Sequence, residues 1–194
     1  RVVWYPNSRP MGPVDPPHSL SPGTPFRLVY VGHVRPEKGV RELVDAVRQL
    51  GREVELDIYG PVFGGISAEE LTSARSVYHG PVDPAAVPEL LRRYDALALP
   101  SYYPGEGYPG VILEAYAAGL PVISTNWQCI PEIVTEESGI LVPPRDVDAL
   151  VSAIRKMSTG DLYQQFRAGA RAKASSFDAV RWADVYVELS NDSG

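Results

Sequence analysis

The sequence predicts a doubly wound α/β domain, in which helices cover both faces of a parallel sheet. From residue 26 onward, short apolar runs of strand length alternate with segments whose apolar residues recur at helical spacing. A helix between two successive strands joins them as parallel neighbours through a right-handed crossover. Ligands of such folds bind beyond the carboxyl ends of the strands. The loops to consider for function are therefore 32–39, 60–66, 100–109 and 124–131.

The expected elements follow one another along the chain. Seven of the 19 prolines lie in the first 25 residues, so residues 6–25 are expected to be an irregular linker after a short strand at 2–5. Residues 53–59 alternate charged with apolar side chains, which predicts a strand with one open face. The other strands are expected at 28–31, 76–79, 96–99, 122–123 and 140–142, and the helices at 40–50, 67–75, 87–94, 109–118, 147–157, 161–175 and 178–190.

Composition excludes several classes of protein. The 194 residues fit one large domain, and 18 Lys plus Arg against 24 Asp plus Glu give a net charge of −6, which argues against binding to nucleic acid. One cysteine and three histidines argue against a disulfide framework or a structural zinc site. No run of about 18 apolar residues is present, so no membrane-spanning helix is expected. The default location is cytoplasmic, with the inner face of the cytoplasmic membrane as an alternative.

The loop 100–109 and the helix after it carry the clearest chemical pattern. Glu106 stands between two glycines at the end of a buried strand, where the backbone can approach a ligand closely. Pro109 suits the first position of a helix. The N–H groups of Gly110, Val111 and Ile112 would then be free, and the amino end of a helix favours phosphate.

Glu114 is the single charge on this otherwise apolar helix. A helix that is apolar on all sides is buried, and a buried carboxylate needs a partner. A salt bridge or a hydrogen bond to the backbone is one explanation, and a role in a binding site is the other.

At this point the sequence resembles a known family, the retaining glycosyltransferases of the GT-B type, in particular family 4. The resemblance is to their C-terminal, donor-binding domain, which has a Rossmann-like fold, and it covers nearly the whole chain. The family signature is a glutamate, seven residues, a second glutamate, and then a pattern of small residues before Pro-Val. Here the signature consists of Glu106, Glu114, Ala115, Ala117, Gly119, Pro121 and Val122.

The resemblance implies a role for each residue that matches the signature. Glu106 would hold hydroxyl groups of the transferred sugar, and the backbone N–H groups of Gly107 and Tyr108 would contact the same sugar. Glu114 would accept hydrogen bonds from the ribose hydroxyls. The stretch that contains Tyr78 and His79 resembles the part of the family whose backbone recognises the nucleotide base.

The loop 32–39 is expected to supply the positive charge for the diphosphate. Taken alone, its charged residues are better explained as an exposed surface loop, since Lys and Arg are common on surfaces. The family carries an arginine directly after the glycine and a lysine five residues later. Lys38 matches the lysine, whereas His33 stands at the place of the arginine. Either Arg35 replaces that arginine, or a neutral His33 only donates a hydrogen bond.

Three further segments have less specific patterns. The glycine-rich segment 60–66 matches no phosphate motif and is expected to be a plain mobile loop. Gln128 and Cys129 replace two glycines of the family, which should narrow that part of the pocket. Asp146 and Asp148 form the Asp-x-Asp pattern that binds metal in a different class of glycosyltransferase, but Asp146 is better explained as a helix N-cap.

The implied reaction is transfer of a sugar, with retention at the anomeric carbon, from a UDP- or GDP-linked donor. No cofactor and no metal are expected. The chain would consist of a hinge strand and linker (1–25), the nucleotide-sugar domain (26–176) and a crossing helix (177–194), through which the chain could self-associate. A missing N-terminal domain would bind the glycan or lipid-linked acceptor. The alternatives are a non-catalytic nucleotide-sugar-binding module, a nucleotide-sugar epimerase and a phosphate-signalling receiver domain.

Overall fold

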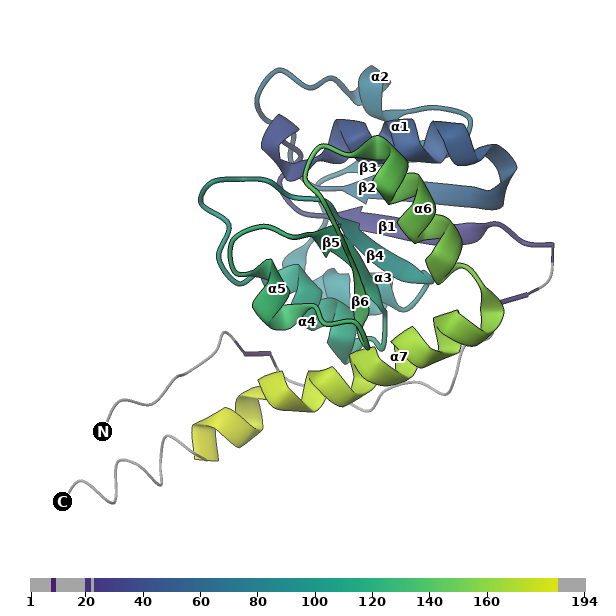
Figure 1. Ribbon diagram of the computed structural model, residues 1–194. Coiled ribbons are helices and arrows are strands. Elements are labelled where there is room, and N and C mark those ends of the chain that lie inside the picture. Colours follow the sequence, from purple (N-terminus) through teal and green to yellow (C-terminus); the bar gives the residue numbers. More distant parts are fainter. Residues whose placement is uncertain (1–7, 10–19, 22, 185–194) are drawn as a thin grey trace.

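The fold is a six-stranded parallel sheet with helices on both faces (Figure 1), as the sequence predicts. The computed structural model describes residues 8–9, 20–21 and 23–184. The strand order is β3-β2-β1-β4-β5-β6, and every pairing between neighbours is parallel. The strands are β1 (Phe26–Val31), β2 (Val54–Tyr59), β3 (Ser76–Gly80), β4 (Ala96–Leu99), β5 (Val122–Thr125) and β6 (Gly139–Val142).

The burial of each strand follows its sequence pattern. The apolar strand β4 is buried at every position, so helices cover it on both faces. The alternating strand β2 buries every second side chain and leaves the others partly open, which confirms the expected open face. Each fully buried Leu or Ile side chain contributes about 1.5–3 kcal/mol to folding.

Two sets of helices cover the sheet. The helices α1 and α6 pack together on one face, whereas α3, α4 and α7 pack on the other (Figure 1). The helices are α1 (Val40–Leu50), α2 (Ala68–Leu71), α3 (Val87–Leu91), α4 (Gly110–Ala117), α5 (Ile130–Ile133), α6 (Val147–Met157) and α7 (Gly160–Ala174), with 3-10 turns at Pro36–Lys38, Gly51–Glu53, Pro84–Ala86 and Ser175–Phe177.

The structure corrects several expected boundaries. The helices α2 and α3 are shorter than predicted, and the short helix α5, with Pro131 in its first turn, was not predicted. The helix α4 begins at Gly110, and Pro109 has extended backbone and caps it. Residues 179–184 are helical. The expected strand at 2–5, most of the linker 6–25 and the end of the last helix lie outside the described residues.

The strand order places a topological switch point between β1 and β4. From β1 the chain continues to β2 on one side, and from β4 it continues to β5 on the other. The crossover helices therefore leave the two central strands on opposite faces, and a crevice opens between them at their carboxyl ends. The loops 32–39 and 100–109 begin at these two ends.

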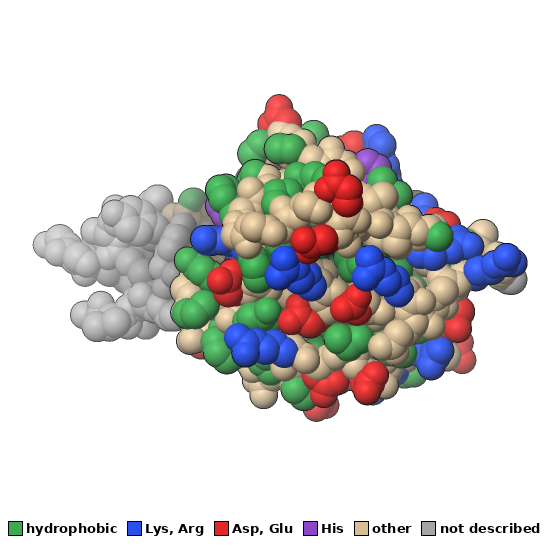
Figure 2. Space-filling model, turned by 90° about the horizontal axis from the view of Figure 1, so that it is seen from above, with side chains coloured by type: hydrophobic (Ala, Val, Ile, Leu, Met, Phe, Trp, Pro, Cys, Tyr) green, Lys and Arg blue, Asp and Glu red, His purple; other side chains and the backbone are tan. Residues whose placement is uncertain are grey.

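The surface that carries α1 and α2 shows acidic and basic side chains interspersed rather than separated by sign (Figure 2). Two of the ion pairs on this surface join Arg41 to Glu70 and Arg48 to Asp45. Such a mixed surface lacks the basic stripe of a nucleic-acid-binding face.

Candidate functional site

The loops 32–39 and 100–109 are in direct contact at the switch point. The N–H group of Tyr102 donates to the carbonyl oxygen of Glu37 over 2.8 Å. Gly39 has a positive φ of 70°, and a Cβ atom at this position would lie 2.1 Å from the carbonyl oxygen of Pro100. Only glycine meets both conditions, so the close approach of the two loops is built into the sequence.

Lys38 and Glu106, 68 positions apart, form an ion pair at this contact. Lys38 Nζ lies 2.6 Å from Glu106 Oε2 and 2.9 Å from Oε1. The hydroxyl of Ser101, two residues after the end of β4, donates to Oε2. The side chains of Lys38 and Glu106 are only 16% and 7% exposed. A carboxylate so far from water needs such partners, because burying an unpaired charge is costly.

Arg35 lies next to this pair but makes different contacts. Its guanidinium carbon is 5.7 Å from the ring centre of Phe63 and 5.4 Å from that of Tyr103. Its buried Nε has no hydrogen-bond partner among the described residues. Lys38 Nζ lies 5.1 Å from the same Tyr103 ring. We call Arg35, Lys38, Ser101, Tyr103 and Glu106 the switch-point site.

His33 lies at the rim of the switch-point site. Its side chain is exposed, and the edge of its ring meets Phe63 at 5.1 Å between centroids. The hydroxyl of Tyr30 donates to the His33 carbonyl oxygen over 2.7 Å. Burial, with the nearby Glu106 charge, raises the pKa of Tyr30, so this phenol stays protonated and keeps donating.

The glycine-rich segment 60–66 is joined to the loop 32–39, which corrects the expectation of a plain mobile loop. Val34 and Val62 form a parallel bridge. The Phe63 N–H donates to the Val34 carbonyl oxygen over 2.8 Å, and the Val34 N–H donates to Pro61 over 2.9 Å. The Phe63 ring, 44% exposed, is thereby held between His33 and Arg35.

The amino end of α4 differs from its prediction in two respects. The N–H group of Ile112 donates to the carbonyl oxygen of Pro109 over 3.0 Å, so it is engaged within the turn rather than free. Glu114 is half-buried rather than buried, and its Oε1 accepts from Arg9 Nε over 3.0 Å. The guanidinium of Arg9 occupies the space beside Gly110, where a Cβ atom would lie 2.2 Å from Arg9 Nη2.

Arg9 also contacts the segment that follows α7. Its N–H donates to the carbonyl oxygen of Phe177 over 3.0 Å, and its carbonyl oxygen accepts from the N–H of Ala179 over 2.9 Å. A residue before the sheet therefore connects the segment after α7 to the amino end of α4.

Three of the remaining predicted positions make contacts outside the switch-point site or none at all. Gly107 is exposed, and a Cβ atom there would meet nothing within 4 Å. The hydroxyl of Tyr108 donates to Glu132. The hydroxyl of Tyr78 donates to the carbonyl oxygen of Gly60 over 2.8 Å.

His79 belongs to a polar cluster on the open face of β2 and β3. Its ring stacks on Tyr59 with 4.6 Å between centroids, and its Nε2 lies 2.6 Å from Asp57 Oδ1. The hydroxyl of Tyr94 donates to the other oxygen of Asp57 over 2.9 Å. The His79 side chain is therefore engaged along the sheet face, away from the switch-point site.

Comparisons with known proteins decide the family. A family model described as glycosyl transferases group 1 matches residues 25–159, well over half of the chain. The chain belongs to the group 1 glycosyltransferases. The recognised resemblance to the C-terminal domain of this family is thereby confirmed.

Named relatives share this glycosyltransferase domain. The chain is 33% identical to the glycogen synthase of Mycobacterium tuberculosis over 180 residues, covering 84% of this chain and 42% of the relative. It is 29% identical to the O-antigen chain mannosyltransferase B of Escherichia coli over 164 residues, covering 77% and 42%. The structure of Anabaena HepE in complex with UDP and glucose superposes with a TM-score of 0.76 at 24% identity, covering 87% of this chain and 49% of HepE. The chain thus spans less than half the length of these proteins.

Several side chains at or beside the switch-point site were not predicted. Ser101 could have been found, because it lies two residues after the end of a buried strand. Tyr103 and Phe63 gave no signal, since an aromatic residue in a loop has no fixed meaning in sequence. Trp127 donates from Nε1 to the carbonyl oxygen of Tyr103 over 2.8 Å, so the segment 124–131 supports the loop 100–109 from behind.

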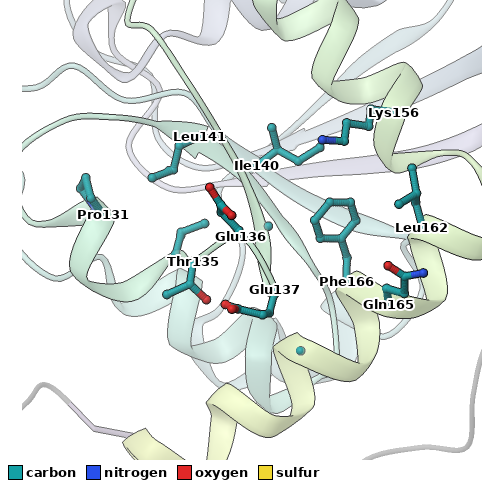
Figure 3. A pocket seen from close by; sticks show the side chains of 13 residues that line it. Pro131, Thr135, Glu136, Glu137, Ile140, Leu141, Lys156, Leu162, Gln165 and Phe166 are labelled. Atoms are coloured by element: carbon teal, nitrogen blue, oxygen red, sulfur yellow. The ribbon is translucent and has the colours of Figure 1, made fainter.

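Other features of the glycosyltransferase domain lie away from the switch point. A groove of about 1110 Å³ runs along β6 against α6 and α7 (Figure 3), and no predicted site residue lines it. No cluster of three or more His, Cys, Asp or Glu suited to a metal ion occurs among the described residues. Within residues 23–184 and the short described segments before them, no helix has the length and apolar character to cross a membrane.

Proposed function

We propose that the chain is the donor-binding half of a retaining glycosyltransferase, which takes a sugar from a UDP- or GDP-linked donor and transfers it to a glycan or lipid-linked acceptor. The observation that carries the proposal is the pairing of Lys38 with Glu106 at the switch point. A cation for phosphate and a carboxylate for hydroxyl groups stand side by side where a doubly wound sheet binds its ligands. The structure of HepE in complex with UDP and glucose supports the same class of donor.

The two charged residues of the pair would bind different parts of the donor. Lys38 and Arg35 would neutralise the diphosphate, helped by the N–H groups of Gly110 and Val111 at the amino end of α4. Glu106 would exchange the Lys38 ammonium for hydroxyl groups of the sugar. Binding of a donor therefore replaces one set of charge-assisted hydrogen bonds by another without exposing a buried charge.

The environment of Glu106 favours a mechanism in which the acceptor hydroxyl attacks the anomeric carbon on the face from which the phosphate leaves. It disfavours a covalent intermediate between the sugar and Glu106. Ser101 donates to Glu106 Oε2, and in the proposed complex the sugar hydroxyls would donate to the same carboxylate, which lowers the nucleophilicity that a glycosidase-type carboxylate needs. In the proposed reaction the bond between the anomeric carbon and the phosphate oxygen breaks, the acceptor hydroxyl attacks on the same face, and the leaving phosphate takes its proton. The chain's task is to position the donor and stabilise the charge of the departing diphosphate.

The proposed enzyme is larger than this chain. The relatives are more than twice as long as the part that matches, and we assign acceptor binding to the part outside the match. The segments 1–25 and 177–194 would form the hinge and the crossing between the two halves. The contacts of Arg9 with Phe177 and Ala179 support this assignment. We propose that no metal ion and no resident cofactor take part.

Calorimetry and turnover together test the proposed function. The 194-residue chain is titrated with UDP, GDP and their glucose and mannose conjugates, with and without Mg²⁺. We expect one base to be preferred and the affinity to be independent of Mg²⁺. The full-length protein is then assayed for transfer, and the anomeric configuration of the product is read by NMR. Lack of binding to any of these compounds, or an inverted product, overturns the proposal; binding without transfer in the full-length protein indicates a non-catalytic module.

A further inference from the structure

Two cations of the switch-point site share one aromatic ring. The guanidinium carbon of Arg35 lies 5.4 Å from the centre of the Tyr103 ring, and Lys38 Nζ lies 5.1 Å from it. The electron-rich face of an aromatic ring attracts cations at such distances. The Phe63 ring contacts the same guanidinium at 5.7 Å, so two aromatic rings hold Arg35.

Hydrogen bonds fix the backbone of Tyr103, and Gly105 leaves room for its ring. The Tyr103 N–H donates to the Ser101 hydroxyl over 3.3 Å, and its carbonyl oxygen accepts from Glu106 N over 3.0 Å and from Trp127 Nε1 over 2.8 Å. The ring lies against Gly105, where a Cβ atom would be 2.8 Å from Tyr103 Cε1. A side chain at position 105 would therefore displace the ring.

The charges of the site do not balance around Arg35. Glu106 compensates Lys38 through two short contacts. No carboxylate pairs with Arg35 among the described residues, and its Nε is a buried donor without an acceptor. Leaving such a donor unsatisfied is unfavourable. An arrangement that holds two cations over one ring at this cost is suited to an anion that binds both.

We infer that Tyr103 is a positioning residue of the donor site. Its ring holds Arg35 and Lys38 next to each other so that both reach the diphosphate, and Phe63 fixes the outer side of Arg35. The inference rests on the proposed function. It adds an explanation of how Arg35 can bind the diphosphate in a chain that has a histidine at position 33. Tyr103 acts through the two cations and through its ring, not through its hydroxyl.

Substitutions at Tyr103 separate the ring from the hydroxyl. We expect Tyr103→Leu to weaken binding of the preferred nucleoside diphosphate to the chain about tenfold in calorimetry, within the range of cation–π contributions. Tyr103→Phe keeps the ring and should bind like the parent. Binding of the matching nucleoside, followed by NMR, should be unchanged in both variants. Tyr103→Leu that binds the diphosphate as well as the parent, or that loses diphosphate and nucleoside equally, overturns the inference.

A double-mutant cycle tests whether Tyr103 acts through Arg35. If it does, Arg35→Gln and Tyr103→Leu together should weaken diphosphate binding by less than the product of the two single effects. Independent effects that multiply would contradict the inference. Tyr102→Leu is the matched control, because it removes the neighbouring ring, which stacks on Arg145 at 4.5 Å instead, and should have less than a threefold effect.

Gly105→Ala tests the position of the Tyr103 ring and leaves the Tyr103 side chain itself unchanged. The added methyl group should displace the Tyr103 ring and weaken diphosphate binding severalfold, whereas Gly160→Ala, at a site with nothing within 4 Å of the new Cβ, should not. Equal affinities for the two variants would count against the inference. If the parent chain binds no nucleoside diphosphate, the proposed function itself fails; if the parent binds and Tyr103→Leu binds equally well, only the inference fails.

Discussion

At the scale of single residues, the proposed function depends on a buried ion pair that is also expected to affect folding. Lys38 satisfies Glu106, and Glu106 is almost completely removed from water. Removing one partner of such a pair leaves an uncompensated charge and costs several kcal/mol, about 3–5 kcal/mol in well-studied cases. Loss of activity on substitution of Lys38 therefore has two possible causes, which an experiment must separate.

We expect Lys38→Ala to abolish measurable sugar transfer by the full-length protein and to lower the stability of the chain. The measurements are a transfer assay and urea unfolding of the chain. The double variant Lys38→Met, Glu106→Gln removes both charges with little change in volume and should recover most of the stability without recovering activity. Near-normal transfer by Lys38→Ala would exclude the phosphate role of this lysine.

At the scale of elements, the amino end of α4 is engaged by the protein itself. Arg9 places a positive charge beside the positive end of the helix dipole, which is unfavourable, and Glu114 one turn further compensates it. Under the proposed ribose role of Glu114, a donor must displace Arg9 from this carboxylate. The segment that carries Arg9 and the segment after α7 would then respond to donor binding together.

We expect Arg9→Gln to tighten binding of the preferred nucleoside diphosphate about two- to fivefold, because a partly exposed ion pair contributes up to about 1 kcal/mol. Calorimetry on the chain measures this effect. The control is Arg41→Gln on α1, which breaks the exposed ion pair between Arg41 and Glu70. It should leave the affinity for the nucleoside diphosphate unchanged. Weaker binding by Arg9→Gln would show that Arg9 contacts the ligand instead of competing with it.

The helix α6 provides a test that separates capping from metal binding. The Asp146 side chain accepts from the N–H of Ala149 over 2.8 Å, which confirms the expected N-cap. We expect Asp146→Ala to lower the free energy of unfolding by about 1 kcal/mol, measured by urea denaturation. Asp148→Ala, in the exposed first turn, should cost less than half as much. A stability of the parent chain that rises on adding Mn²⁺, and no longer does so in Asp146→Ala, would support the metal interpretation.

At the scale of the whole molecule, the fold could be predicted and part of the site could not. The alternation of strand and helix patterns determined the parallel sheet, because each period is a local property of the chain. Lys38 and Glu106 could be placed at one edge of the sheet, since parallel strands share their carboxyl ends. The stacking of Arg35 on Tyr103 and the pairing of Arg9 with Glu114 depend on how distant loops approach each other, and no local pattern contains that information.

The whole molecule also has a predictable response to alkali. Burial is the largest cause that raises the pKa of four tyrosines, Tyr30, Tyr94, Tyr116 and Tyr163. In the unfolded chain these phenols ionise at about pH 10. Above that pH the unfolded state has lost protons that the folded state keeps, so the stability that burial of the neutral phenols provides is complete below about pH 10 and is lost as the pH rises.

We therefore expect the free energy of unfolding to be nearly constant from about pH 8 to 9.5 and to fall steeply above about pH 10. Each buried tyrosine contributes a slope of about 1.4 kcal/mol per pH unit. Urea unfolding at a series of pH values measures the slope, and ultraviolet absorbance shows whether a group of phenols among the 11 tyrosines ionises only on unfolding. Tyr163→Phe removes one phenol and keeps the packing of the ring on Phe26. The slope should therefore decrease by the contribution of one proton, about 1.4 kcal/mol per pH unit. Ionisation of all tyrosines near pH 10 in the folded chain would contradict the burial that the structure shows.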